Sequence, residues 1–561
     1  TGLLWKTQFS LTRKITDTKR FLDPLSSKNT TPQTAENPSS GELNTSRGNE
    51  FYWDLSSTLS YNRSVEKHHI NLLLGVNARS AKTDNISASY RGFPSGALSS
   101  PNYAEEIVSK PVSSDNSTRL IGFLGTLNYS YNDVYLLDAS VRMDGSSEFG
   151  ADKRFAPFWS AGTGVNIHNY GFMKGQTVID QLKIRVSYGQ TGKVNFPPYV
   201  ARTTYKMFTD GWYKTGFGGT LYALGNTNLT WETTNTWDAG VELSLWKRLL
   251  YIKASYYQKK TVDLVNSVTI PSSTGFTTYM DNIGEVENKG YELEFRSEVV
   301  RRKDLFVAVF ANLAHNENRI LKISESLKAY NDRVKDHFAN SNRFDGSNTQ
   351  PFTQYVEGGS QTSIWGVPSL GIDPATGEEI FIRPDGSITN TWNTNDQVVL
   401  GDMEPKIQGT FGLNATYKNL SLYMTFMYEA GGQIYNSTLR DKVEDVNVYT
   451  SNVDKRVFSE RWQEPGDKAR YRKLTSGVGG SIMRTRPTSR FVEDNNVLTL
   501  NSISLGYDFD AGQKWMKTIG LSMLRFEIGA NDVCRWSSVK VERGLNYPYA
   551  RSFNFSLKAA F

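Results

Sequence analysis

Apolar and polar residues alternate along almost the whole chain, with the period of two that is typical of β-strands. The pattern predicts about sixteen strands. The predicted strands are Leu3–Phe9, Phe51–Tyr61, Ile70–Ala78, Ile121–Tyr129, Tyr135–Met143, Trp159–Ile167, Leu182–Tyr188, Thr233–Leu245, Leu250–Tyr256, Tyr291–Phe295, Leu305–Leu313, Ile407–Tyr417, Leu420–Tyr428, Leu498–Tyr507, Leu524–Ala530 and Phe553–Phe561.

The connections between these strands are alternately short and long. Tyr131–Asp133 and Lys418–Asn419 are tight turns, whereas Asn316–Glu404 and Ala430–Asn496 are far longer than the usual ~4–6 residues of a compact domain. Bacterial outer-membrane barrels combine short periplasmic turns with long extracellular loops. The sequence therefore predicts an all-β fold, an antiparallel transmembrane β-barrel with strands of ~9–11 residues. Phe561 is expected at the short-turn rim.

Composition supports a barrel over a helical membrane protein. The longest apolar run, Leu305–Ala311, is far shorter than the ~20 residues of a membrane helix. Mean hydropathy is −0.47, yet aromatic residues make up 12% of the chain. Barrel strands average out as polar and carry aromatic girdles at the membrane interfaces. The expected girdle residues are Trp5, Trp53, Trp159, Trp237, Tyr256 and Tyr291.

Charge and cysteine content exclude several functional classes. One cysteine, Cys534, cannot form an intrachain disulfide or a four-cysteine zinc site. The chain has 63 basic and 57 acidic residues without a long basic run, which does not indicate nucleic-acid binding. Since the chain opens at Thr1 without a signal peptide, we expect a mature or truncated product.

Candidate chemistry is sparse. Gly189–Val194 lacks the spacing and the Ser or Thr of a phosphate-binding loop, so nucleotide binding is not expected. His68 and His69 fit a solvated turn better than a metal site. No Ser/His/Asp set stands out, and we predict no enzyme, no catalytic residues, no cofactor and no metal.

Calcium is the one open alternative. Oxygen-bearing side chains gather between Asp373 and Asp402, and Ca²⁺ takes six to eight oxygen ligands. Their spacing does not match an EF-hand, and Asp-Pro, Thr-Gly and Asp-Gly pairs also make ordinary turns. Turns are the favoured interpretation.

Aromatic residues outside the predicted strands are the candidate substrate-binding residues, because sugar rings and peptide side chains both stack on aromatic faces. The alternative is that each of them packs the loops together. The candidates are Trp212, Tyr213, Phe352, Tyr355, Trp365, Trp392 and Tyr435.

Several short motifs occur in an order that resembles one protein family. They are Ser187–Gly192 with Phe196–Tyr199, Asn228–Glu232 with Asp238–Glu242, Asn282–Gly284 with Asn288–Glu292, Gly371–Gly377, Gly401–Pro405, Arg461–Trp462 with Pro465–Asp467, and Leu498–Tyr507. Together they resemble the C-terminal barrel portion of SusC/RagA-like TonB-dependent outer-membrane transporters of Bacteroidetes. Lys193 stands where the family commonly has Asn.

The resemblance implies a barrel of about twenty-two strands filled by an N-terminal plug. Residues 1–561 would then be the C-terminal part of such a barrel, without plug or first strands. It further implies TonB-dependent uptake of oligosaccharides or oligopeptides across the outer membrane of a Gram-negative bacterium, with a SusD-like surface lipoprotein over the loops. The alternatives are a passive sixteen-stranded porin and a surface binding or adhesion barrel.

Overall fold

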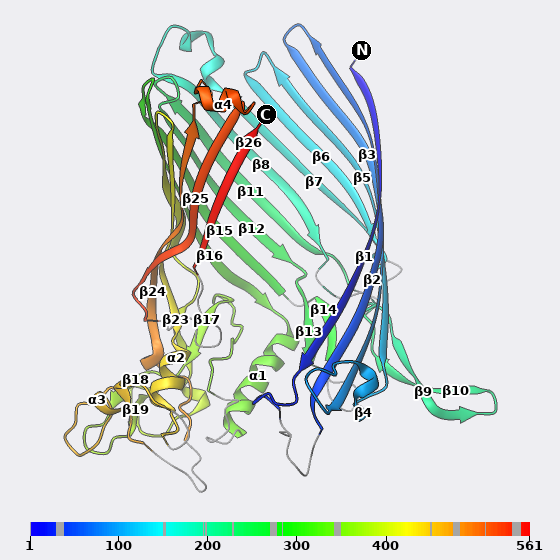
Figure 1. Cartoon of the computed structure of the whole chain (residues 1–561), viewed down its shortest axis with the longest axis vertical. Helices are drawn as coiled ribbons and strands as arrows, with labels where there is room; N and C mark the ends of the chain where they lie inside the picture. Colours follow the sequence, from blue (N-terminus) through cyan, green and yellow to red (C-terminus); the bar gives the residue numbers. More distant parts are fainter. Residues whose placement is uncertain are drawn as a thin grey trace.

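The computed structural model describes residues 2–29, 39–149, 153–194, 196, 199–226, 229–269, 278–282, 284–340, 349–448, 452–474, 483–510, 512–540 and 551–561. Long antiparallel strands form one curved wall, with the longer connections gathered at one rim (Figure 1). Within these residues, no helix has both the length and the apolar character needed to cross a bilayer.

The wall is a 17-stranded sheet, of which β4 (Glu106–Ile107) is a two-residue strand beside β3. The other strands are the sixteen that the alternation predicts, because each predicted run lies in or overlaps one of them. They are β1 (Leu3–Leu22), β2 (Ser40–Val65), β3 (His68–Phe93), β5 (Val112–Tyr131), β6 (Tyr135–Ser146), β7 (Phe155–Asn166), β8 (Ile179–Lys193), β11 (Glu232–Leu245), β12 (Leu250–Val262), β15 (Gly284–Arg301), β16 (Leu305–Ile323), β22 (Ile407–Tyr417), β23 (Leu420–Tyr435), β24 (Val492–Phe509), β25 (Met523–Ser537) and β26 (Ser552–Ala560).

The expected strand length of ~9–11 residues is wrong for most of the wall. β26 has 9 residues, whereas β2 and β3 have 26 each. Ladder hydrogen bonds continue beyond the stretch that carries outward apolar side chains, because backbone pairing does not depend on an apolar face. The apolar pattern therefore marks the lipid-facing part of a strand rather than the whole strand.

Consecutive strands of the wall pair in antiparallel register, from β1 with β2 to β25 with β26. In the described part of the chain, β1 pairs with β2 alone and β26 with β25 alone. The wall therefore has two free edges, and the first and last strands lie apart in Figure 1.

Tight turns form one rim of the wall. Asn132 and Asp133 lie between β5 and β6 with φ of 53° and 55°, and Lys418 has φ of 50° between β22 and β23. This left-handed conformation suits two-residue hairpin turns and is tolerated best by Gly, Asn and Asp. The C-terminal end of β26 reaches the same rim, as the sequence predicts (Figure 1). The helix α4 (Lys514–Thr518) also lies there.

The long connections at the opposite rim contain small elements of their own. Those that lie between wall strands are the hairpin β9 (Thr204–Tyr213) with β10 (Gly216–Ala223), the pair β13 (Val265–Thr269) with β14 (Thr278–Asn282), α1 (Glu325–Asn340), β17 (Ser363–Gly366), β18 (Ser369–Ile372), β19 (Glu379–Ile382), β20 (Ile388–Thr389), β21 (Val398–Asp402), α2 (Ser437–Leu439) and α3 (Arg456–Ser459). The two longest loops are shorter than predicted, residues 324–406 and 436–491, because the flanking strands are longer.

The two faces of the wall differ in composition. Because successive side chains of a strand point to opposite faces, the pairing register assigns each residue to one of them. Trp159, Tyr188 and Trp237 form one outward row, with ring centroids 5.5 and 4.6 Å apart. On each of these strands, the polar residues that alternate with the outward rings lie on the concave inner face, as the predicted alternation requires.

Candidate functional site

A row of polar side chains crosses six neighbouring strands on the inner face. Each member is the register partner of the next, so that charges of opposite sign alternate over four strands before two neutral polar residues end the row. Its members, on β8, β11, β12, β15, β16 and β22, are Lys183, Glu242, Lys253, Glu294, Asn312 and Thr410. We call this set the inner charge row.

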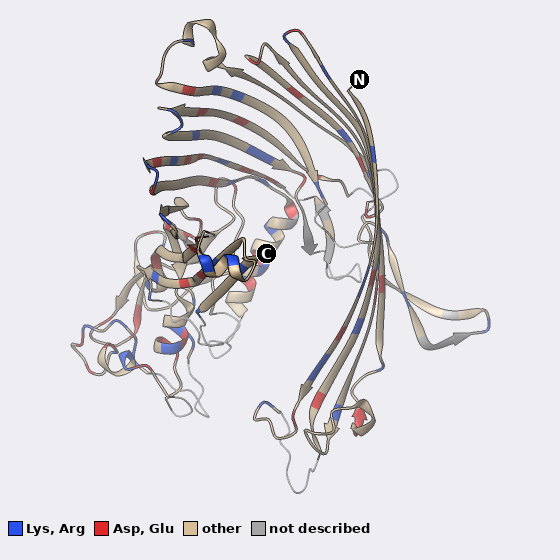
Figure 2. Cartoon of the chain, turned by 45° about the horizontal axis from the view of Figure 1, so that its top comes forward, with Lys and Arg blue, Asp and Glu red and all other residues tan. Residues whose placement is uncertain are grey.

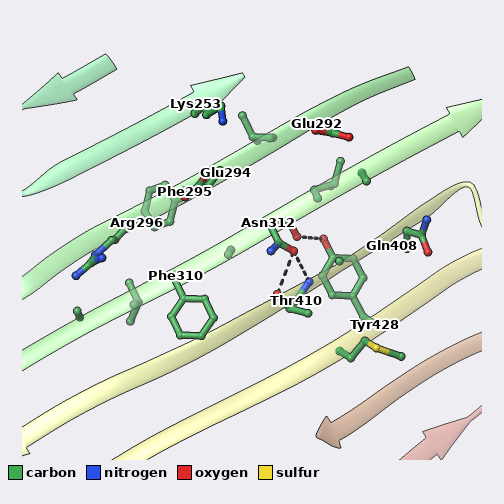
Figure 3. A pocket seen from close by; sticks show the side chains of 18 of the residues that line it. Lys253, Glu292, Glu294, Phe295, Arg296, Phe310, Asn312, Gln408, Thr410 and Tyr428 are labelled. Atoms are coloured by element: carbon green, nitrogen blue, oxygen red, sulfur yellow. Dashed lines mark hydrogen bonds between the residues drawn. The ribbon is translucent and has the colours of Figure 1, made fainter. Parts of the chain in front are cut away.

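The inner charge row is held in place by contacts within the wall. Lys183 Nζ lies 3.9 Å from a carboxylate oxygen of Glu242. The amide and hydroxyl of Thr410 donate to Asn312 Oδ1 at 2.6 and 3.1 Å, which Figure 3 shows. A cavity of 730 Å³ lies along this part of the wall. It offers carboxylates, an ammonium group, an amide and a hydroxyl to a hydrated solute.

Glycines let inward-facing arginines lie flat on the wall. The guanidinium of Arg185 crosses Gly240 and pairs with Asp238 at 2.5 Å. A Cβ at Gly240 would be 3.1 and 3.2 Å from the Arg185 Nε and Nη2 atoms. The glycine of the motif Asp238–Glu242 therefore has a steric role.

The same arrangement recurs near the C-terminus. Arg525 of β25 crosses Gly506 of β24, and its Nη2 donates to the Ser421 hydroxyl of β23 at 2.9 Å. A Cβ at Gly506 would lie 2.6 Å from Arg525 Nη2. One guanidinium thus joins three strands without extending into the lumen, the space that the inner face surrounds.

The two longest loops pack together into one unit, which we call the loop body: the described residues of 324–406 and 436–491. Arg490 joins them, since its guanidinium makes a bidentate pair with Glu379 at 2.8 Å and contacts Glu444 at 2.8 Å. Arg472 pairs with Glu444 at 3.3 Å and with Asp445 at 3.0 Å. These five charged side chains are buried or nearly so.

Burial and pairing act in opposite directions on these groups. Burial by itself raises the pKa of Glu444, but the facing charges of Arg490, Arg472 and Arg461 outweigh it and leave the pKa lowered. Burial likewise lowers the pKa of Arg490, and the carboxylates of Glu379 and Glu444 outweigh it and raise the pKa. Both groups are therefore charged in the folded loop body at neutral pH, and each depends on its partners.

Three of the predicted aromatic residues pack in or against the loop body, Trp392 and Phe352 within it and Tyr435 from the end of β23. Trp392 is 9% exposed, its ring centroid lies 5.4 Å from that of Phe338, and its indole N–H donates to the Pro487 carbonyl at 3.0 Å. Phe352 packs on Phe338 at 5.4 Å. Tyr435 is 8% exposed in a second cluster around Phe491. These three rings therefore pack the loops together, which is the alternative to substrate binding given above.

Two other candidates remain closer to open space. Tyr355 is half-buried beside Tyr330, with ring centroids 5.7 Å apart, and Asn331 fixes its backbone through two hydrogen bonds of 2.6 and 2.9 Å. Trp365 lies in β17 and is partly exposed, although its buried indole nitrogen has no hydrogen-bond partner among the described residues. These two are the aromatic candidates that the structure leaves for a ligand.

Trp212 and Tyr213 lie near the tip of the β9–β10 hairpin, where their backbones pair with residues 217 and 216. Their side chains fall outside the described residues. The hairpin projects away from the wall on its outer side (Figures 1 and 2), and a role of these two residues in substrate binding stays a prediction. The sequence indicates loop residues here, but not the direction in which a loop leaves a wall.

Two of the acidic side chains between Asp373 and Asp402, those of Asp373 and Asp385, make local turns. Asp373 accepts from the Ala375 amide at 3.0 Å and the Thr376 hydroxyl at 2.7 Å, which lowers the pKa of Asp373. Asp385 accepts twice from Ser387. No three His, Cys, Asp or Glu side chains among the described residues are grouped so that they could hold a metal ion. Calcium binding here stays an untested alternative to the favoured interpretation, ordinary turns.

Sequence comparison matches residues 2–425 to the family described as TonB dependent receptor-like, beta-barrel. TonB-dependent receptor P26 of Formosa agariphila is 29% identical over 500 residues, which cover 87% of this chain and 49% of that protein. TonB-dependent receptor SusC of Bacteroides thetaiotaomicron is 27% identical over 406 residues, 70% of this chain and 38% of that protein. The chain thus spans about half or less of the length of these two relatives.

The fold is also similar to a solved structure. The RagAB peptide transporter superposes with a TM-score of 0.79 at 23% identity, over 96% of this chain and 57% of that one. A second RagAB structure, of the peptide importer in its closed-closed state, gives a TM-score of 0.81 over 100% of this chain and 60% of that one.

Proposed function

Since the chain belongs to the TonB-dependent receptor-like β-barrel family of the outer membrane, we propose that it forms the wall and loops of a nutrient importer. Its cargo would be an oligosaccharide or an oligopeptide, taken up with energy transmitted by TonB. The family consists of transport receptors rather than enzymes.

The inner charge row is the observation that carries this proposal. Polar groups that alternate in sign along the lumen suit the passage of hydrated solutes, because they offer hydrogen-bond partners in place of water. One of the similar solved structures is a peptide transporter, which supports the peptide class, and oligosaccharides are the second candidate class.

Uptake measurements in cells test this proposal. Labelled oligosaccharides and oligopeptides of similar size are supplied to cells that carry or lack the gene, with and without a protonophore. We expect import of one class that stops when the proton gradient is removed. Import that persists without the gradient, together with swelling of liposomes by the purified protein in small sugars, would instead indicate the passive porin.

The loop body provides the surface for a lipoprotein partner in this proposal. Leu370 and Ile388 belong to the small sheet β18–β19–β20 and are 62% and 63% exposed. We propose that a SusD-like surface lipoprotein covers them. Leu370→Asp with Ile388→Asp should reduce its recovery with the purified protein, whereas Phe172→Asp on the short-turn rim should not. Equal recovery of the lipoprotein with all variants would place the partner elsewhere.

The free edges of β1 and β26 indicate that further strands lie between them in the complete barrel. Unpaired N–H and C=O groups in lipid cost several kcal/mol each, so the edges need partners. We propose that other strands of the same transporter, with a plug, supply them. Cysteines at Thr7 and Asn554, with Cys534 replaced by Ser, test direct closure with a short bifunctional cross-linker. A high yield of cross-linked chain would support a sixteen-stranded barrel.

A further inference from the structure

The outer face of β1, β2, β3 and β5 carries an uncharged belt. These strands pair without a register shift from Leu3 to Asp17 of β1, so every second residue of each strand faces outward. The row through Trp5 continues over β6 to Trp159 and therefore lies on the outer face. Four successive outward rows hold no charged residue: Leu3, Tyr61, Leu72 and Leu127; Trp5, Leu59, Leu74 and Gly125; Thr7, Ser57, Val76 and Phe123; and Phe9, Leu55, Ala78 and Ile121.

The belt has the height of a membrane. On β5, the outward residues from Tyr131 at the short-turn rim to Ile121 are all apolar, aromatic or glycine. At ~3.3 Å per residue and a tilt of ~40°, this stretch is roughly 25 Å tall, as is the apolar band of an outer-membrane barrel. Ile121 therefore marks the end of the hydrocarbon layer on this strand, on the side of the long loops.

Basic residues follow this belt towards the long loops. The first charged outward residue on each of the four strands is a cation: Arg13 on β1, Arg47 on β2, Lys82 on β3 and Arg119 on β5. The outward carboxylates Asp17, Asp84 and Asp115 all lie at least two rows beyond the row of Arg119. The two rows next to the belt thus hold three cations and no carboxylate.

Lys82 and Arg119 form a compact pair in these rows. They are diagonal neighbours on the outer face, because Lys82 is the register partner of Ser117 and Arg119 is the register partner of Ser80. Diagonal neighbours lie about 7–8 Å apart, so that one small group can contact both long side chains. Both cations are exposed and both serines are partly exposed.

The charges of this pair are largely uncompensated. Lys82 Nζ lies 3.6 Å from Asp84 Oδ1, in an exposed pair of the kind that contributes little. Among the described residues, the Arg119 guanidinium makes neither an ion pair nor a hydrogen bond. Arg119 lies two residues beyond Ile121, roughly 5 Å higher, and the head groups extend about 5–8 Å beyond the hydrocarbon layer. The pair is therefore at the level of the head groups.

The chemistry of the pair suits a phosphate group. A guanidinium binds phosphate oxygens through two parallel hydrogen bonds, and an ammonium group adds a point charge. The hydroxyls of Ser80 and Ser117 supply two further donors. Basic residues at a membrane surface attract anionic lipids, and here the belt below offers room for the acyl chains.

We propose that Lys82 and Arg119, with Ser80 and Ser117, bind the phosphate of a lipid head group in the leaflet next to the long loops. The acyl chains of the same lipid lie on the uncharged belt. Arg13 extends the site, since it lies two strands away in the row of Lys82. This inference rests on the location of the family in the outer membrane and not on the cargo, TonB or a lipoprotein.

Lipid retention by protein extracted from the outer membrane tests the site. Phosphatidic acid, or diacylglycerol with the same chains, is added in detergent, and native mass spectrometry counts the lipids retained per protein. Lys82→Gln with Arg119→Gln should lower the retention of phosphatidic acid severalfold and leave that of diacylglycerol unchanged. Lys110→Gln with Lys468→Gln removes the same charge from exposed loop residues and should change neither.

Two further arms complete the test. Lys82→Arg with Arg119→Lys keeps both charges and should retain phosphatidic acid, which shows that the substituted wall still folds. Inorganic phosphate in excess should not displace the lipid. Equal retention of phosphatidic acid in the native protein and in Lys82→Gln with Arg119→Gln would overturn the proposal, and so would an equal loss in the loop control. Displacement by inorganic phosphate would assign the site to a free ion and overturn the lipid.

Discussion

The guanidinium of Arg185 lies across the backbone of Gly240 and pairs with Asp238 at 2.5 Å. Its position depends on the absence of a side chain at Gly240, because a Cβ there would approach two guanidinium nitrogens to 3.1 and 3.2 Å. Because of this pair, the long Arg185 side chain lies flat on the inner face and does not extend into the lumen.

Gly240→Ala should therefore displace the Arg185 guanidinium and weaken its pair with Asp238. We expect a loss of about 1 kcal/mol in unfolding free energy, measured as a lower urea midpoint in detergent. Gly529→Ala is the matched control, since the nearest described atom to a Cβ at this strand glycine, the Ile503 carbonyl oxygen, would be 3.8 Å away. An equal loss in both variants would assign the effect to the glycine backbone rather than to Arg185.

Arg490→Met should separate the two halves of the loop body. Without the guanidinium, Glu379 and Glu444 are buried without their main partner, which costs about 3–5 kcal/mol. Limited proteolysis should then cut residues 349–406 and 436–491 much faster while the wall stays intact. Arg470→Met removes an exposed partner of Glu493 at 3.3 Å and should change the cleavage rate little. Unchanged cleavage in Arg490→Met would show that apolar packing alone joins the loops.

The contribution of Glu444 should depend on pH. Because the pKa of Glu444 is lowered in the folded state, its ion pairs stabilise the loop body fully above the unfolded value of about 4.3. This stability is lost as the pH falls through the lowered folded pKa. The difference in protease resistance between the native protein and Glu444→Gln should be large at pH 7 and narrow below about pH 4. A constant difference down to pH 3 would contradict the charge argument.

Trp392→Ala should destabilise the loop body by about 3–5 kcal/mol, because it removes a buried ring and the hydrogen bond to Pro487. Trp365→Ala should cost less, since that ring is partly exposed. If Trp365 rather than Trp392 contacts cargo, binding measured by calorimetry on folded protein should fall in Trp365→Ala and persist in Trp392→Phe. The reverse order would restore the ligand role predicted for Trp392.

The wall could be predicted from the sequence because its signal is local. Alternation from Phe51 to Tyr61 indicates a strand and its two faces without knowledge of the partner strand. The full length of β2 could not be predicted in this way, since residues 40–50 pair in the same ladder without a regular apolar face. Backbone hydrogen bonds leave no mark on composition.

The surroundings of the loop residues could not be predicted, because they depend on contacts between residues that are far apart in the sequence. Trp392 and Pro487 are 95 residues apart, and Arg490 and Glu379 are 111 apart. Aromatic content in a loop indicates contact of some kind, and only the packing of the second loop shows that the ring of Trp392 is covered. For Trp212 and Tyr213, the sequence does not predict the direction in which the β9–β10 hairpin leaves the wall.

The spacing of the inner charge row also determines how far its electrostatic potential extends into the lumen. Neighbouring strands lie about 4.8 Å apart, so a charge of the same sign recurs about every 10 Å across β8 to β15. The potential of such an alternating array cancels within roughly one repeat of its surface, because each charge is offset by its neighbours. At the centre of the lumen, the inner charge row therefore gives a solute neither an electrostatic well nor a barrier. Selection by charge then has to come from other groups than this row.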